Sequence, residues 1–176
     1  MHAVAVTDEP SRAALKDTQA RIGAIMQVHR RLYTSDDVEQ VDMADYMKGL
    51  VDELGQSLSA GGVRPILLRA DDLRLSTDRA VALGVIVAEL VTNACKYAYR
   101  DGEPGEVRVR LESVPGGRAR MSVEDDGVGL PEGGVRPRGT GLGQTVIAAM
   151  GKSLGSSVTF DPAHRRGARA VIEIEV

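Results

Sequence analysis

Residues 89–98 read Glu89-Leu90-Val91-Thr92-Asn93-Ala94-Cys95-Lys96-Tyr97-Ala98, inside a mostly apolar stretch that predicts a helix from Thr77 to Tyr99. Glu89, Asn93 and Lys96 are spaced i, i+4 and i+7, so they share one face of this helix. Burying such polar groups in an apolar helix is costly unless they serve a purpose. The set suits a hydrated Mg²⁺ and the phosphates it bridges, because Mg²⁺ prefers oxygen ligands and keeps several waters. Taken alone, the stripe also fits a polar helix edge that faces solvent.

A glycine-rich turn follows the next predicted strand, in the order Val123-Glu124-Asp125-Asp126-Gly127-Val128-Gly129-Leu130-Pro131. A carboxylate at the end of a strand can accept a hydrogen bond from an adenine amino group. The glycines then leave room for the ring to approach the backbone. Turns of this kind are common, so this one is weak evidence by itself.

A second glycine-rich segment, Gly139-Thr140-Gly141-Leu142-Gly143, precedes a predicted helix over Thr145 to Leu154. Free backbone N–H groups at the start of a helix favour phosphate. The segment is not a P-loop, because no Gly-Lys-Ser/Thr follows it. Read alone, it is equally compatible with a flexible turn.

In their order and spacing, these three segments together resemble the GHKL ATP-binding superfamily, which includes histidine kinases, gyrase-type ATPases and the Hsp90 class. Residues 89–98 resemble its N box, Asp126-Gly127-Val128-Gly129 its first glycine box, and residues 139–143 its second. The resemblance covers roughly the C-terminal two-thirds of the chain. It implies that ATP and Mg²⁺ are the ligands and that the fold is of the Bergerat type.

The resemblance also implies a role for each residue of these segments. Asn93 would coordinate Mg²⁺, Glu89 would activate the nucleophile or hold a metal-bound water, and Lys96 would reach phosphate. Asp126 would bind the adenine amino group. The other expected nucleotide contacts are Gly127 and Gly129 at the adenine, and Gly139, Thr140, Gly141, Leu142 and Gly143 at the phosphates. Phosphoryl transfer needs mostly positioning and charge neutralisation, which these parts can supply.

The remaining hydrophobic periodicity predicts helices over residues 11–32 and 43–58, strands near 63–68, 106–114, 118–124, 157–160 and 168–176, and turns at 115–117 and 162–167. Strands in hairpins with helices beside them predict an α+β, two-layer α/β sandwich. Arginines alternate along the two central strands and are expected on a solvated sheet face. We place a helical dimerisation region at residues 1–60 and the ATP-binding domain at residues 61–176.

The N-terminal region resembles the second half of the dimerisation and phosphoacceptor region of HisKA_2-type histidine kinases, which are related to the HWE kinases, in residues 20–33 and 41–47. The chain has no tryptophan, so the Trp-x-Glu signature of true HWE kinases is absent. The resemblance implies a homodimer through the N-terminal helices and a response-regulator receiver domain as partner.

Two departures from the family pattern concern individual residues. None of His2, His29 and His164 has the expected acceptor motif, so we expect this chain to bind ATP without phosphorylating itself in the family manner. Ala168 stands where the family often has a hydroxyl that helps to hold the adenine. One lost hydrogen bond costs about 0.5–1.5 kcal/mol, so the affinity is expected to be weaker but not lost.

Composition limits the kinds of ligand and the cellular location that we expect for the protein. A net charge of -3 argues against nucleic acid, and one cysteine, Cys95, allows no internal disulfide. No signal pattern or membrane span is expected, so we predict a cytoplasmic location. The favoured function is the catalytic module of a two-component sensor histidine kinase, passing phosphate from ATP to a histidine and then to a regulator aspartate. The alternatives are a dimeric docking adaptor with vestigial catalysis and an anti-sigma-type GHKL serine kinase; a gyrase-like ATPase fits less well.

Overall fold

The computed structural model describes residues 40–58, 64–100, 103–130 and 142–176. The helices are α2 (Met43–Leu58), α3 (Thr77–Tyr97) and α4 (Leu142–Ser153). The strands are β1 (Gln40–Asp42), β2 (Ile66–Ala70), β3 (Arg74–Ser76), β4 (Val107–Val114), β5 (Arg118–Asp125), β6 (Thr159–Phe160) and β7 (Ala168–Glu175). The predicted helix over residues 43–58, the long helix and both hairpins are confirmed. The predicted helix over residues 11–32 lies outside the described residues.

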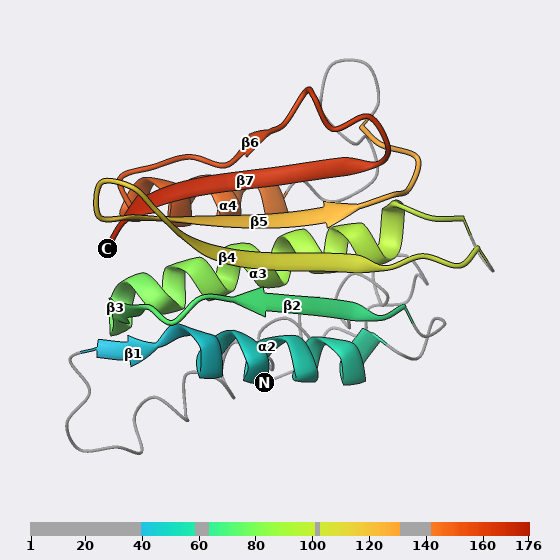
Figure 1. The fold of residues 1–176 in the computed structure, drawn as a ribbon. Coiled ribbons are helices and arrows are strands. Elements are labelled where there is room, and N and C mark those ends of the chain that lie inside the picture. Colours follow the sequence, from blue (N-terminus) through green and yellow to red (C-terminus); the bar gives the residue numbers. More distant parts are fainter. Residues whose placement is uncertain (1–39, 59–63, 101–102, 131–141) are drawn as a thin grey trace, which may run out of the picture.

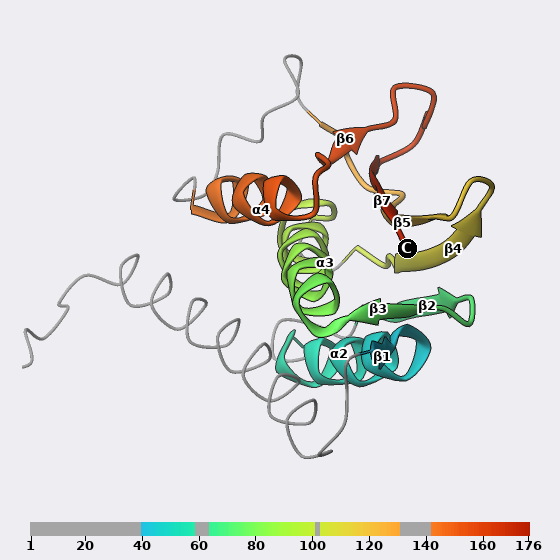
Figure 2. The same cartoon turned by 90° about the vertical axis from the view of Figure 1, so that its left-hand side faces the viewer.

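A five-stranded sheet forms one layer, with the strand order β2-β4-β5-β7-β6. Strand β2 runs parallel to β4, and the other neighbours are antiparallel. Helices α3 and α4 lie behind this sheet in Figure 1, and the view of Figure 2 separates the two layers. The predicted two-layer α/β sandwich is therefore confirmed.

The sheet has one apolar and one charged face, because side chains alternate along each strand. Val107 and Val109 of β4 and Val123 of β5 are buried against the helices. Their strand neighbours Arg108 and Arg110 lie on the other face, where they make ion pairs. The expected polar sheet face is thus present, but its arginines are held in a network.

Helix α2 does not have the packing that the sequence predicted. Its apolar side includes Met43, Met47 and Leu50, all at most 1% exposed, and belongs to the same core as α3 and the sheet. Strand β1, directly before α2, pairs antiparallel with β3. The expectation that this helix buries its apolar side against a second copy of the chain is wrong, because that side is already covered within the molecule.

Helix α3 is central to the core, with twelve buried residues on several sides. By length and composition it could cross a membrane, but 67% of its apolar window is buried inside the protein, as in the core helix of a globular domain. It packs between α2 and α4 and against β4 and β5. Residues 89–98 therefore lie at the centre of the fold, at the C-terminal half of this helix.

Candidate nucleotide site

The polar stripe of α3 is not a solvent-facing edge. Glu89 is only 4% exposed, and Asn93 and Lys96 are half-buried. The three residues rise along one side of the helix toward its C-terminal end, so the amide and the ammonium lie nearer the surface than the carboxylate. This gradient fits a Mg²⁺ that keeps most of its waters and takes few protein oxygens.

Asp125, the last residue of β5, points toward the helices. It is 4% exposed, and in the sheet it pairs with Val107 and Ala168, which face the core. Its Oδ1 accepts hydrogen bonds from the backbone N–H groups of Gly127 at 3.0 Å and Ala168 at 3.2 Å. The carboxylate is therefore fixed on the helix side of the sheet.

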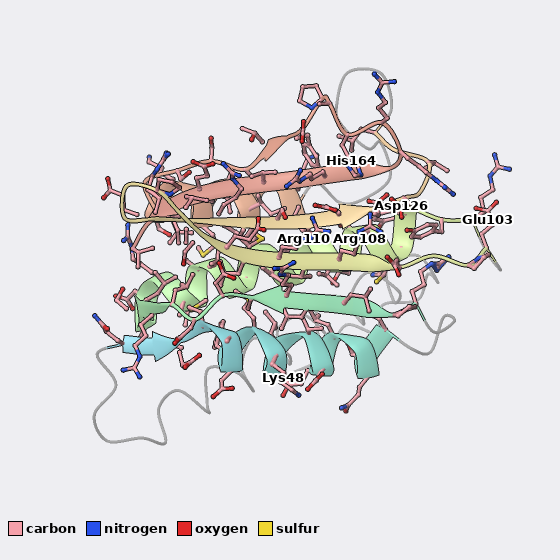
Figure 3. All side chains as sticks on the ribbon, in the orientation of Figure 1. Lys48, Glu103, Arg108, Arg110, Asp126 and His164 are labelled. Carbon is pink, nitrogen blue, oxygen red and sulfur yellow. The ribbon has the colours of Figure 1, made fainter. Side chains whose placement is uncertain are left out.

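Asp126, the residue to which the adenine contact was assigned, points the other way. Its carboxylate forms a two-pronged ion pair with Arg108, with distances of 2.7 Å to Oδ2 and 2.8 Å to Oδ1. Hydrogen bonds from Arg108 hold the pKa of Asp126 below its ordinary value. Figure 3 shows both residues on the sheet face turned away from α3 and α4. The predicted role of Asp126 does not fit this position.

The alternation of side chains along β5 could have indicated from the sequence that Asp125 lies on the helix side of the sheet. Val123 and Asp125 occupy the same face of β5, and Val123 is a core residue. The prediction matched Asp126 to the glycine next to it. If Asp125 is taken as the acid, the turn reads Asp-x-Gly-x-Gly. Asp126 is then the residue between the acid and Gly127, and Val128 is the residue between the two glycines.

Three chain segments meet closely at this turn. The N–H of Val128 donates to the carbonyl of Ala98 at 2.7 Å, and a Cβ on Gly127 would collide with that same carbonyl. Gly129 has φ +75°, and a Cβ there would lie 3.0 Å from the carbonyl oxygen of Gly167. The turn after β5 therefore packs closely between the end of α3 and the start of β7. Only glycine fits at positions 127 and 129, because a Cβ there would meet the neighbouring backbone.

The pKa of the Cys95 thiol depends on charges near the end of α3 and on this turn. Cys95 is half-buried. Burial raises the pKa of the Cys95 thiol, nearby Arg64 lowers it, and the charge of Asp125 raises it further. Asp125 thus acts on a residue that lies between Asn93 and Lys96 in the sequence.

The second glycine segment is described only where α4 begins. Leu142 is the first residue of this helix, and Gly143 follows it. Gly139, Thr140 and Gly141 lie outside the described residues. The predicted helix is present but begins at Leu142, three residues before the predicted Thr145, and α4 packs directly on α3. The start of a helix, with the positive end of its dipole, is suited to phosphate.

Two residues near the start of β7 were singled out by the sequence. Ala168 is 9% exposed and bonded to Asp125, so the missing hydroxyl falls beside Asp125 and not beside Asp126. The ring Nε2 of His164 lies 3.3 Å from the carbonyl oxygen of Asp125. His164 is half-buried within the predicted turn, whose neighbours Ala163 and Arg165 are exposed.

A hollow of about 410 Å³ opens on the other side of the turn, lined by Pro65, Tyr99, Pro104, Gly105, Glu106, Asp126 and Arg166. It contains none of the stripe residues of α3. In the described part of the chain, no three His, Cys, Asp or Glu side chains are placed to hold a metal. The nucleotide interpretation therefore depends on the helix side of the sheet and not on this hollow.

Comparison with known proteins agrees with this architecture. Residues 78–176 match the family model described as histidine kinase-, DNA gyrase B- and HSP90-like ATPase, and residues 1–58 match a histidine kinase model, HisKA_2. The first match spans more than half of the chain, so the protein belongs to the histidine kinase-, DNA gyrase B- and HSP90-like ATPase family.

Individual relatives are histidine kinases. The chain is 31% identical to the sensor histidine kinase PdtaS of Mycobacterium tuberculosis over 172 residues, which cover 94% of this chain and 33% of PdtaS. The fold is similar to the histidine kinase domain of the Erythrobacter litoralis EL346 blue-light activated histidine kinase, with a TM-score of 0.76 at 22% identity, covering 90% of this chain and 74% of that one. The chain spans about a third of the length of the curated relatives it matches.

Proposed function

We propose that this chain is the ATP-binding catalytic module of a two-component sensor histidine kinase. In this role it transfers the γ-phosphate of ATP to a histidine, from which it passes to an aspartate of a response-regulator receiver domain. The carrying observation is that the turn directly after Asp125 packs, at Gly127 and Val128, against Ala98 at the end of α3. The same helix holds Glu89, Asn93 and Lys96. Family membership supports the same assignment.

The proposed roles follow the chemistry of each position. Asp125, in place of Asp126, accepts the hydrogen bond of the adenine amino group, and Gly127 and Gly129 let the ring approach the backbone. Asn93 supplies an oxygen to a Mg²⁺ that keeps its waters, and Glu89 holds one of those waters or orients the nucleophile. Lys96 and the start of α4, with Leu142 and Gly143, face the phosphates. The bound Mg²⁺ supplies charge neutralisation for phosphoryl transfer.

The proposal also covers the location and the oligomeric state of the module. We propose a cytoplasmic location and a homodimer that uses residues before Gln40, because α2 is occupied within the domain. Gly139, Thr140 and Gly141 complete the phosphate contacts.

A calorimetric titration with ATP, with and without Mg²⁺, tests the proposal. We expect binding by the parent that requires Mg²⁺ and is weakened by Asn93→Ala. Lys48→Ala, on the exposed side of α2, serves as the matched control and should bind as the parent does. No Mg²⁺-dependent affinity in the parent would leave the docking adaptor as the function.

A further inference from the structure

Asp126 is held from two directions although it lies on the far side of the sheet from the proposed nucleotide. Its carboxylate is gripped by both terminal nitrogens of Arg108, at 2.7 Å and 2.8 Å. Its backbone N–H donates to the hydroxyl of Tyr99 at 2.9 Å. Side chain and main chain of one residue are thus fixed by separate partners.

Arg108 is itself firmly placed. Its side chain is 18% exposed and also contacts Glu106 at 2.9 Å and Glu124 at 3.4 Å. Glu124 has a side chain only 6% exposed, and its Oε1 also forms ion pairs with Arg110 Nη1 at 3.2 Å and with Arg169 Nε at 3.1 Å. Figure 3 shows Arg108 and Arg110 side by side on this face, beside Asp126. A two-pronged pair inside such a partly buried network is stronger and more directional than an isolated surface pair.

Tyr99 connects Asp126 to the end of α3. It lies two residues after the helix, and its hydroxyl donates to the carbonyl of Glu106 at 2.7 Å while accepting from Asp126. The Arg64 guanidinium lies 5.1 Å from the centre of its ring. Arg64 also donates to the carbonyl of Arg100 at 3.1 Å. The Tyr99 ring is therefore fixed on one side by a cation and at its hydroxyl by two backbone groups.

The residues on either side of Asp126 are those proposed to meet the adenine. Asp125 precedes it and Gly127 follows it, and both carry contacts on the helix side of the sheet. A rotation of the backbone at Asp126 would move both neighbours at once. A binding group must be held within about 0.5 Å of its productive place by the residues that support it.

We infer that Arg108 and Tyr99 are positioning residues for nucleotide recognition: by clamping Asp126 on one face of the sheet, they hold Asp125 and Gly127 in place on the other. Neither residue touches the nucleotide. The inference rests on the proposed function for the identity of the ligand. The clamp itself is a property of the free protein, so its two consequences can be measured separately.

The first test needs no nucleotide. Amide hydrogen exchange of Gly127 and Val128 is measured by NMR in the parent, in Arg108→Met and in Arg120→Met. Arg120 makes a comparable pair with Glu173, at 2.6 Å, on the same sheet face and away from the turn. We expect exchange at both amides to rise at least about threefold in Arg108→Met and to stay at the parent level in Arg120→Met. Equal exchange in all three proteins would overturn the clamp, whether or not the chain binds ATP.

The second test measures ATP and GTP affinity in the presence of Mg²⁺. GTP lacks the adenine amino group that Asp125 would recognise, so a loosened turn should reduce ATP binding more than GTP binding. We expect Arg108→Met and Tyr99→Phe to weaken ATP binding about 3- to 10-fold, equivalent to roughly 1 kcal/mol, and to lower the ATP-to-GTP preference. Arg108→Lys, which keeps the charge but not the fork, should recover part of the loss.

The outcomes separate the inference from the function on which it rests. If the parent binds ATP, Asp125→Asn binds it roughly 10- to 100-fold more weakly, and both clamp variants keep the parent's ATP-to-GTP preference, the function stands and the inference is overturned. If the parent binds no ATP, the proposed function fails, and the exchange experiment still decides whether the clamp holds the turn. Urea unfolding of each variant identifies any general loss of stability, which would weaken both nucleotides equally.

Discussion

Asp125 and Asp126 are neighbours in the chain, but their carboxylates lie on opposite faces of the five-stranded sheet. Asp125 is buried toward α3, whereas Asp126 is paired with Arg108 on the charged face. The sequence pattern predicts the adenine contact at Asp126, whereas we propose Asp125 for it. The difference makes the nucleotide assignment testable by single substitutions.

The two aspartates should respond differently when each is made neutral. Asp125→Asn can still accept from Gly127 and Ala168, so the fold should survive, but it loses a charged acceptor for adenine. Hydrogen bonds to charged groups contribute about 1.5–3 kcal/mol, which corresponds to roughly 10- to 100-fold in ATP affinity. Asp126→Asn should cost less, about tenfold or below, through the loosened turn. Equal losses measured by calorimetry would contradict the assignment.

Restoring the missing hydroxyl at the start of β7 should strengthen ATP binding. Ala168 is hydrogen-bonded to Asp125, so a threonine there would place its hydroxyl beside the proposed adenine site. The expected gain in Ala168→Thr is about 2- to 10-fold, the equivalent of one net hydrogen bond. Ala168→Val has nearly the same shape without the hydroxyl and is the control. A valine variant that gains as much as the threonine variant would attribute the effect to packing.

The orientation of Asp125 can be tested through Cys95 without any ligand. Burial, with a contribution from Asp125, raises the pKa of this thiol, so the midpoint of its alkylation with pH should lie above the ordinary value of about 8.5. Only the thiolate reacts. Removing the negative charge in Asp125→Asn favours the thiolate, so the midpoint should move to lower pH. Asp126→Asn should leave it nearly unchanged, and a larger shift there would place the wrong carboxylate near α3.

Gly127 should tolerate no side chain. In Gly127→Ala the new Cβ would collide with the carbonyl of Ala98, and the backbone must move away from α3. Overpacking of this kind costs about 1–3 kcal/mol in the free energy of unfolding, and ATP binding should be lost with it. Gly55 in α2 has no atom within 4 Å of the place that a Cβ would occupy, so Gly55→Ala should gain about 0.5–1 kcal/mol from helix propensity. Urea unfolding measures both, and a neutral Gly127→Ala would refute the close packing.

Helix α2 should behave as part of the core. Leu50 is 1% exposed, so Leu50→Ala should lower the free energy of unfolding by about 2–5 kcal/mol. Lys48→Ala, on the exposed side of the same helix, should leave the free energy of unfolding nearly unchanged. Sedimentation of both variants should show the parent's self-association under native conditions. A Leu50→Ala variant that dissociates but keeps its stability would return α2 to the dimer interface.

Much of the fold could be predicted from local patterns. The periodicity of Met43 to Leu58 and the alternation in β4 and β5 identified these elements, because each buries one face. Strands β1 and β3, three residues each, were missed, since so short a stretch carries no periodic signal. The parallel pairing of β2 with β4 was also not predicted, because pairing depends on contacts distant in sequence.

The candidate site was predicted in part. The stripe of Glu89, Asn93 and Lys96 follows from helix geometry, and its burial at Glu89 supports the interpretation. We propose Asp125 in place of Asp126 as the acid beside the glycines, and the alternation of side chains along β5 carried the information for that choice. Arg108 and Tyr99 gave no local signal of a role at the turn, because their importance arises only when β4, β5 and the end of α3 come together.

The pairing of β1 with β3 joins the beginnings of two helices. Strand β1 pairs residue by residue with Arg74, Leu75 and Ser76, which lead directly into α3. Met43, the first residue of α2, follows Asp42 directly, so this ladder links the starts of α2 and α3. A displacement of the small two-stranded ladder would therefore move the beginnings of both helices together.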